Sequence, residues 1–339
     1  MVLIASTSQS SIDALSLVTG LQDRFVSKSN QVTTACGFKT LFQPVKWLRD
    51  DGVHGGGVRF EGASNGIFNT ASINISQVQY EDLPEKKLAA ATAFSAIIHP
   101  DHPIAPSVHI HISWTAFKDG QGYWRIMADL NPAIENQADT NCFVATLKKI
   151  SGQYYNEATT QGDYYFYIPS LKCYRGVSHF YLEAFTRGNN ADDFAFANRF
   201  GEDIIDCYCE ILSKNITQAT NPNNEQLNLQ LDYHTLYFYQ VVTLDRGTTS
   251  GLLVHDQNDV GVLGSLPAYI DCELLASWSS CTPEPQNKLI ENILALFPDE
   301  DICEVTNEIK LKIANVIRNH YKTYPKATTL QATVFSKKE

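Results

Sequence analysis

The chain has 339 residues, 44% of them hydrophobic and 19% charged, and its formal net charge is −11. This composition predicts a folded protein with a core of ordinary size, in one or two domains. The acidic balance argues against nucleic acid and anionic membranes as partners, because both need a basic surface. No apolar run approaches the roughly 18 residues of a membrane span, so no transmembrane segment is expected.

Cysteine usage points to a reducing compartment. The eight cysteines are scattered along the chain with no Cys-x-x-Cys pair. This pattern is typical of reduced, mostly buried thiols in a cytoplasmic protein. The N-terminus also lacks the basic region and the long apolar segment of a signal peptide, which supports the same expectation.

Apolar residues recur with helical spacing in several segments. They predict helices over residues 10–28, 83–92, 137–154 and 191–214, and one or two more over residues 286–322. Ser10 or Ser11 is the predicted N-cap of the first helix. Residues 219–228 are polar and predict a surface loop, and residues 322–339 predict a tail.

Alternating and aromatic-rich runs predict strands. They cover residues 53–60, 66–75, 162–168, 177–185 and 236–244. Residues 245–251 predict a turn after the last of them. Three consecutive glycines, Gly55 to Gly57, lie in the first run, but no Lys-Ser/Thr pair follows them. We therefore expect a close approach of the backbone to a neighbour or a ligand rather than a phosphate-binding loop.

The segment from Ser107 to Pro132 is the one around which the other predicted elements are organised. Two alternating runs, 108–115 and 123–130, flank a glycine-containing connection and predict a β-hairpin. One face of the hairpin is almost entirely apolar and is expected to be buried. The other face carries two rows of mostly polar side chains: His109, His111, Ser113 and Thr115, and opposite them Tyr123, Arg125, Met127 and Asp129.

The register of the hairpin decides which polar residues meet. If the turn is centred on the first glycine of the connection, His111 pairs with Asp129 and His109 with Asn131. His109 and His111 have metal-ligand spacing, and Asp129 or His179 would complete a three-ligand site. The alternatives are that these histidines transfer protons or bind substrate, or that they are structural.

Strands in adjacent pairs, flanked by helices, predict an α+β protein with a large antiparallel sheet covered by helices. Several segments between residues 47 and 278 together resemble the oxygen-dependent coproporphyrinogen III oxidase family. These segments are Gly55-Gly56-Gly57; Ile97-Ile98-His99-Pro100; Ala105-Pro106-Ser107-Val108-His109; Trp124 to Asp129-Leu130-Asn131-Pro132, similar to the family's W…DLTP; Tyr174-Arg175-Gly176, similar to its R-R-G; Asp245-Arg246-Gly247-Thr248; and Ser265-Leu266-Pro267.

The resemblance implies a homodimeric enzyme with a flat antiparallel sheet sandwiched between helices. It implies O2 as co-substrate, no metal or organic cofactor, and conversion of propionates of coproporphyrinogen III to vinyl groups with release of CO2 and hydrogen peroxide. On this basis the expected catalytic residues are His109, Asp129 and Arg246. The expected substrate-binding residues are Arg175, Arg125, His111, Asp245 and Ser113. Arginine forks suit propionates, and an aspartate can accept hydrogen bonds from pyrrole N–H groups.

With this resemblance the chain is divided into a helical segment 1–45, an oxidase-like α+β domain 46–285, and C-terminal helices with a tail over 286–339.

The sequence also departs from the family pattern on the polar face. His111 and Ser113 stand where the family has an asparagine and an arginine, and Arg125 and Met127 stand where it has glycines. Arg125 is expected to replace part of the lost positive charge. Two alternatives follow: a relative that oxidises a different substrate, with or without a His-ligated metal, and a non-catalytic protein that binds a ligand on the same fold.

Overall fold

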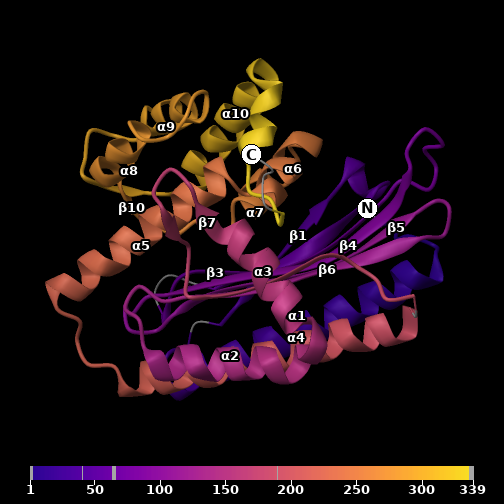
Figure 1. The fold of residues 1–339 in the computed structure, drawn as a ribbon, viewed down its shortest axis with the longest axis horizontal. Coiled ribbons are helices and arrows are strands. Elements are labelled where there is room, and N and C mark those ends of the chain that lie inside the picture. The colour runs from indigo at the N-terminus through magenta and orange to yellow at the C-terminus, as the bar shows by residue number, and fades with distance from the viewer. Residues whose placement is uncertain (1–2, 40, 63–65, 189, 336–339) are drawn as a thin grey trace.

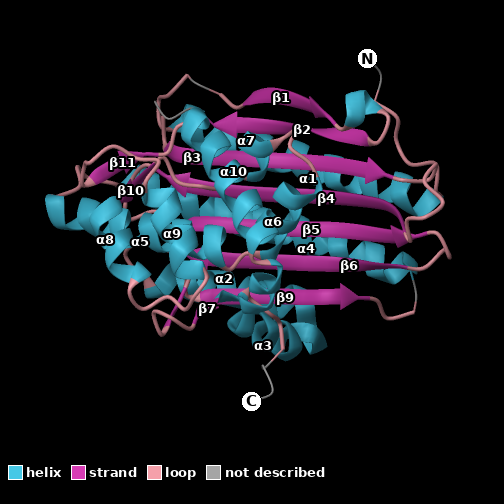
Figure 2. Cartoon of the chain, turned by 90° about the horizontal axis from the view of Figure 1, so that it is seen from above, coloured by secondary structure: helices cyan, strands magenta, loops and turns pink. Residues whose placement is uncertain are grey.

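One antiparallel sheet of seven strands organises the part of the chain that the computed structural model describes, residues 3–39, 41–62, 66–188 and 190–335. Its strands are β1 (Gln43–Leu48), β2 (Gly55–Gly62), β3 (Phe68–Gln79), β4 (Leu88–Pro100), β5 (Ser107–Phe117), β6 (Gly122–Asn131) and β9 (Ser178–Phe185), in that spatial order. Six of them are neighbours both in sequence and in the sheet, and the seventh joins after two intervening helices (Figure 2).

Three helices cover one face of the sheet (Figure 1): α1 (Gln9–Ala35), α2 (Gln137–Ser151) and α4 (Asn190–Gln218). The apolar rows of β5 and β6 point into this layer, where Ile110, Ile112, Trp124 and Ile126 are fully buried. The face of the hairpin that alternation predicted to be apolar is therefore a core face, as expected.

The opposite face lies under the C-terminal helices (Figure 1): α5 (Asn224–Thr243), α6 (Arg246–Val254), α7 (Asp259–Val262), α8 (Cys272–Ser279), α9 (Gln286–Leu294) and α10 (Asn307–Thr323). Their apolar side chains form a second core, which includes residues of α5, α9 and α10 such as Phe238, Ile290 and Ile317. The sheet thus separates two cores, one on each side.

The remaining elements complete the edges. Helix α3 (Tyr155–Phe166) packs along the edge strand β9, and a Cβ on its Gly162 would lie only 2.8 Å from Cβ of His179. Two small sheets pair β7 (Tyr167–Ile168) with β8 (Cys173–Tyr174), and β10 (Tyr269–Asp271) with β11 (Ile302–Glu304). Short 3-10 turns lie at Asp50–Gly52, Gly152–Tyr154 and Pro325–Leu330.

The expected fold class, an α+β sandwich of helices around an antiparallel sheet, is confirmed. The predicted helices over 10–28, 137–154 and 191–214 and the pair over 286–322 are present, although Ser8 rather than Ser10 or Ser11 caps the first. The predicted tail contains the 3-10 turn and the buried Val334, and its last four residues lie outside the described ranges. The division into segments 1–45, 46–285 and 286–339 stays a prediction.

Three predictions of secondary structure were wrong. Residues 88–92 belong to strand β4 rather than to a helix, residues 162–166 end helix α3, and residues 236–243 lie in helix α5. Helix α5 buries residues around most of its circumference, among them Tyr237, Phe238 and Tyr239. Because residues 237–243 are all buried, this part of the helix has no apolar stripe, and its aromatic residues predicted a strand.

Two other segments differ in detail. The predicted loop over 219–228 ends at Asn223, which caps α5 in a reciprocal capping box with Gln226. The predicted turn over 245–251 is the first part of helix α6, capped by Asp245. Both differences come from N-caps that were read as loop residues.

The triple glycine serves strand pairing. A Cβ on Gly55 would lie 2.1 Å from the backbone oxygen of Gln77, and one on Gly57 would lie 2.1 Å from that of Ile75. Gly55 also has a φ of 93°, which favours glycine. The predicted close approach is therefore to a neighbouring strand, β3.

Candidate active site

The polar face of β5 and β6 has a register different from the predicted one. His109 pairs with Asp129, His111 with Met127 and Ser113 with Arg125. The predicted pairs of His111 with Asp129 and of His109 with Asn131 were wrong by two residues. The connection is tight, with Phe117 N–H donating to the Gln121 carbonyl over 2.8 Å, which places the turn one residue earlier than assumed. A shift of two residues keeps both faces unchanged.

Asp129 is the centre of a buried charged cluster. Its side chain is fully buried, and its oxygens accept hydrogen bonds from His109 Nδ1 at 2.8 Å, Arg175 Nη2 at 2.6 Å and Asn131 Nδ2 at 2.7 Å. Burial alone would raise the pKa of Asp129, but the Arg175 guanidinium and His109 outweigh it and hold the pKa well below its usual range. The carboxylate is therefore ionised throughout the neutral range.

The Arg175 guanidinium, like the Asp129 carboxylate, is fixed by several contacts. Its Nη1 donates to Gln240 Oε1 at 2.6 Å, and its guanidinium lies over the rings of Phe166 at 4.3 Å and Tyr237 at 4.5 Å. It follows β8 in a loop between α3 and β9, and its N–H donates to the Phe166 carbonyl. Stacking and hydrogen bonds together fix the plane of this guanidinium.

His109 connects the cluster to the open side of the face. Its side chain is 16% exposed, whereas Asp129 is not exposed at all. Because a carboxylate only accepts, Nδ1 of His109 carries the proton in this contact, and Nε2 keeps a lone pair when the ring is neutral. A histidine oriented in this way by a carboxylate can take up or give a proton at Nε2.

His111 and Ser113 form a separate pair, with His111 Nε2 and Ser113 Oγ 3.0 Å apart. Burial, with Arg125 and His109 as nearby positive charges, lowers the pKa of His111 to about 3. His111 is therefore neutral at ordinary pH and can bind a ligand only as a neutral donor or acceptor.

Arg125 is engaged by an acidic residue of the neighbouring strand. Its Nη2 lies 2.6 Å from Glu183 Oε1, and Tyr181 donates to the other oxygen of Glu183. Burial opposes ionisation of Glu183, but Arg125 outweighs it and Arg246 adds a smaller contribution, so the pKa of Glu183 is lowered. Arg125 is thus already neutralised by an ion pair.

Asp245 and Arg246 lie at the start of α6. Asp245 caps the helix by accepting from Thr248 N–H, and Tyr165 of α3 donates to its other oxygen at 2.8 Å. Arg246 is the first residue of the helix and is exposed. Of the two, Asp245 has a structural task, and Arg246 is accessible to a ligand.

A three-ligand metal site is not assembled on this face. Of the two candidates for the third ligand, His179 contacts Asp163 Oδ1 and the Arg175 carbonyl, and Asp129 is already bound to His109. Within the described ranges, no group of three or more His, Cys, Asp or Glu side chains is placed to hold a metal ion.

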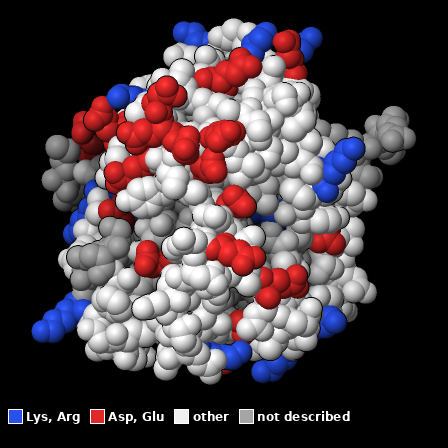
Figure 3. All heavy atoms as spheres, turned by 90° about the vertical axis from the view of Figure 1, so that its left-hand side faces the viewer, with Lys and Arg blue, Asp and Glu red and all other residues white. Residues whose placement is uncertain are grey.

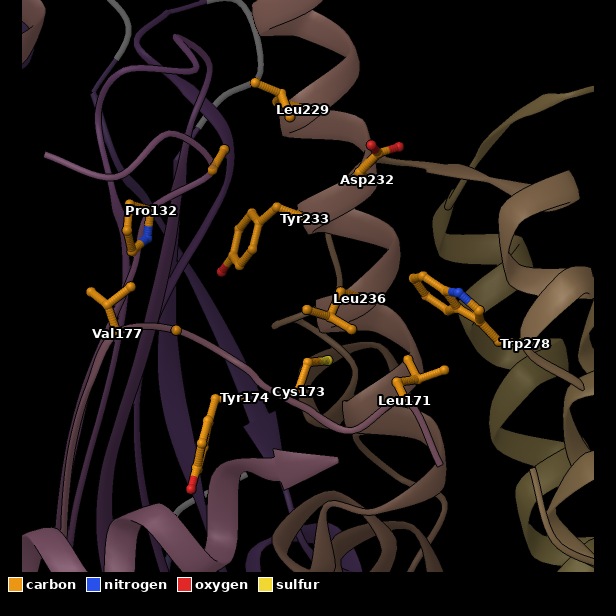
Figure 4. Close-up of a pocket in the computed structure, with 12 residues that line it drawn as sticks. Pro132, Leu171, Cys173, Tyr174, Val177, Leu229, Asp232, Tyr233, Leu236 and Trp278 are labelled. Carbon is orange, nitrogen blue, oxygen red and sulfur yellow. The ribbon is translucent and has the colours of Figure 1, made fainter. Parts of the chain in front are cut away.

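A groove of about 500 Å³ adjoins the cluster (Figure 4). Its floor is one stripe of α5, Leu229, Asp232, Tyr233 and Leu236, at helical spacing. Gly176 also lines the groove. Tyr174, Pro132 and Val177 lie on one side of α5, and Trp278 of α8 lies on the other (Figure 4). Among the described residues that line the groove, Asp232 is the one that carries a charge. Acidic side chains gather on the side of the molecule where α5, α8 and α9 lie (Figure 3).

Comparison with known sequences agrees with these features. The sequence model of the coproporphyrinogen III oxidase family matches residues 14–294. The chain belongs to this family.

Curated relatives of the chain are named oxygen-dependent coproporphyrinogen-III oxidase. The oxygen-dependent coproporphyrinogen-III oxidase of Rickettsia akari (strain Hartford) is 28% identical over 251 residues, 70% of this chain and 87% of the relative. The protein of that name from Rickettsia bellii (strain OSU 85-389) is 29% identical over 238 residues, 66% of this chain and 82% of the relative. The resemblance noted in the sequence is thus confirmed at the level of the family.

Several residues of the site were not predicted from the sequence. Glu183 and Tyr181 share the side of β9 that carries His179, so the alternation of the predicted strand held a usable signal. The sequence held no usable signal for Gln240, because the part of α5 that contains it was predicted to be a strand. Tyr165 was missed for the same reason, since its run was assigned to a strand instead of to α3.

Proposed function

We propose that the chain is an oxygen-dependent coproporphyrinogen III oxidase. The proposal is supported by family membership over residues 14–294 together with the buried Asp129, Arg175 and His109 cluster on the polar face. In the proposed reaction one propionate and one O2 give one vinyl group, one CO2 and one hydrogen peroxide. The substrate supplies both electrons, so no metal or organic cofactor is part of the proposal.

His109 is the proposed proton-transfer residue, because it is the exposed end of the cluster. Asp129 and Arg175 act through it. The Asp129 carboxylate already accepts three hydrogen bonds and is fully buried, so we assign it to positioning His109 rather than to direct contact with pyrrole N–H groups. Arg175, equally buried, keeps that carboxylate ionised.

Arg246 is the proposed anchor for a propionate. It is exposed at the N-terminus of α6, where the helix also favours negative charge. Arg125 is assigned a secondary role, because a propionate would have to compete with Glu183 for it. His111, Ser113 and Asp245 line or support the same face.

The test is anaerobic incubation of metal-free protein with coproporphyrinogen III, followed by air, with chromatography of the products and a peroxide assay. Vinyl-bearing product and peroxide are expected from the wild type. His109→Gln should lower kcat by about 100-fold or more, which is the usual range for a lost acid–base group. The matched control His54→Gln lies near the other end of the sheet and should keep full activity. No product from folded wild-type protein would overturn the proposal.

A second candidate is favoured by the Arg125–Glu183 pair. This pair and Tyr181 occupy part of the polar face, so a smaller carboxylated heterocycle would fit where a flat macrocycle meets side chains. Turnover of such a compound, with none of coproporphyrinogen III, would favour this candidate. Binding without turnover of either would favour a ligand-binding protein.

We further propose that the protein acts as a homodimer, as the family resemblance implies, and that it works in the cytoplasm, as its scattered cysteines indicate. Among the described residues, no helix is long and apolar enough to cross a bilayer. Sedimentation equilibrium of the purified chain tests the dimer, and a monomer at working enzyme concentration would contradict it.

A further inference from the structure

Two cysteines lie against each other on the helical layer below the sheet. Cys142 belongs to α2 and Cys207 to α4, and their sulfur atoms are 3.8 Å apart. Cys142 is exposed, whereas Cys207 is 5% exposed. All eight cysteines lie in the described ranges and all are free thiols.

We propose that Cys142 and Cys207 form a peroxide-reactive dithiol that closes to a disulfide between α2 and α4. The class of substrate is a hydroperoxide, with hydrogen peroxide as its simplest member. The two sulfurs need to approach by only about 2 Å to reach the S–S bond length of about 2.05 Å. Rotation of the exposed Cys142 side chain is the least hindered way to do so.

The chemistry balances with one peroxide per pair. Cys142 loses its thiol proton to solvent and its sulfur attacks one peroxide oxygen. The O–O bond breaks, and the departing hydroxide takes a proton from solvent and leaves as water. Cys142 is then a sulfenic acid. Cys207 attacks its sulfur, the S–O bond breaks, and the hydroxyl leaves as a second water with the Cys207 proton. Two thiols lose two electrons, and the peroxide gains them.

The surroundings assign the order of these steps. Burial raises the pKa of the Cys207 thiol to about 12, with a smaller contribution from its contact with Cys142. A thiol of this kind stays protonated and resists direct oxidation, so the first oxidation falls to the exposed Cys142. Cys209, two residues further along α4, is buried among other neighbours that include Ser29 of α1, so it does not compete for Cys142.

The biological meaning rests on the proposed function, because that reaction would release hydrogen peroxide at the protein itself. The disulfide would then form in proportion to the peroxide that turnover releases, and it would cross-link helices α2 and α4. The disulfide would also close a loop between two residues that are 65 positions apart in the sequence. Such a loop restricts the unfolded chain and therefore raises thermal stability.

The experiment treats the full chain with hydrogen peroxide in the absence of porphyrinogen. It is followed by alkylation, non-reducing digestion and mass spectrometry. We expect the cross-linked peptide pair of Cys142 and Cys207, lighter by two hydrogens than the sum of the two peptides, and a melting temperature that rises by a few degrees and falls back after dithiothreitol. Cys142→Ser should abolish both effects and leave Cys207 reduced. The matched control Cys281→Ser removes another exposed thiol and should change neither.

The proposal is overturned if Cys142 accumulates as sulfinic or sulfonic acid while Cys207 stays reduced, or if neither residue reacts. A parallel sample without added peroxide, supplied with coproporphyrinogen III and air, separates the two proposals. Failure of the proposed function removes the disulfide from this sample alone, whereas failure of the dithiol removes it from both.

Discussion

Asp129 is a charged side chain with no access to water, and its neighbours decide whether it is tolerated. The Arg175 guanidinium, His109 and Asn131 satisfy its oxygens. Such an arrangement is stable as a unit, but the removal of one member leaves the others buried and unpaired. The cluster therefore joins β5, β6 and the loop before β9 through one carboxylate.

Replacement of Arg175 by Met should show this dependence. The change leaves the Asp129 carboxylate without its main counter-charge, so we expect the free energy of unfolding to fall by about 3–5 kcal/mol. Urea denaturation followed by circular dichroism measures it. The matched control is Arg125→Met, whose side chain is 30% exposed and whose loss should cost about 1 kcal/mol. Equal losses for the two variants would contradict this account of the cluster.

Two histidines with a lowered pKa predict a pH dependence of stability. Burial lowers the pKa of His234 to about 3 and, with nearby positive charges, that of His111 to about 3. Below the unfolded value of about 6.5 the unfolded chain takes up protons that the folded chain does not. Stability is therefore fully present above about pH 6.5 and is lost as pH falls toward 3, at up to about 1.4 kcal/mol per pH unit for each histidine.

His234→Leu isolates one of these contributions. The variant should show a shallower loss of stability between pH 6.5 and 4, by up to about 1.4 kcal/mol per unit. Urea midpoints across this range provide the measurement. His102→Leu changes a histidine that is not buried and serves as the control. An unchanged slope for His234→Leu would mean that this residue is protonated in the folded protein.

At the scale of elements, the start of helix α6 is tied to helix α3 through Asp245. Asp245 caps the helix through Thr248 N–H and also accepts from Tyr165, which belongs to α3. The same carboxylate thus caps the N-terminus of α6 and ties this helix to α3. Arg246 follows directly, so its position depends on this cap.

Asp245→Ala should lose the cap and leave a buried tyrosine hydroxyl without its acceptor. We expect a loss of about 2–3 kcal/mol in the free energy of unfolding, from a cap of about 1 kcal/mol and an unsatisfied hydroxyl. Asn223→Ala, which removes the exposed cap of α5, should cost only about 1 kcal/mol. Urea denaturation compares the two. Losses of the same size would show that the Tyr165 contact adds nothing.

Individual elements also show which features could be predicted from the sequence and which could not. The period of two in residues 108–130 placed the correct side chains on each face, because burial requires it. It could not fix which polar residues pair, since that depends on the geometry of the connection. The aromatic run of α5 predicted a strand because unbroken burial of residues 237–243 removes the helical period there. Arg175 and Asp129 were named from motifs, but their contact joins residues 46 positions apart, and no local pattern encodes it.

At the scale of the whole molecule, the C-terminal helices share a core with α5. Leu289 and Ile293 of α9 and Ile313 of α10 belong to the same buried cluster as Tyr237 and Val241 of α5. Apolar surface removed from water is the main stabilising contribution to such a layer. Residues of α9 and α10 are therefore part of the fold that holds Gln240 against Arg175.

Truncation after residue 285 tests this dependence. It would expose the apolar side of α5, so we expect a protein that aggregates or binds a hydrophobic dye and melts well below the full chain. Dye fluorescence and light scattering measure this. Removal of residues 336–339 alone provides the control and should have no such effect. A soluble, cooperatively folding chain that ends at residue 285 would support the predicted separation of segment 286–339.

The two cores also differ in their natural chromophores. Trp114 and Trp124 lie together in the lower core, the one between the sheet and helices α1, α2 and α4, with ring centroids 5.4 Å apart. Trp278 packs on the upper core, the one between the sheet and the C-terminal helices. Replacing Trp47 and Trp278 by Phe would leave emission from the lower core alone, and a chain with Trp278 alone would report on the upper one. The molecule thus carries separate optical reporters for its two layers, so that the order in which they melt, or the response of the upper layer to a ligand, can be followed without an added label.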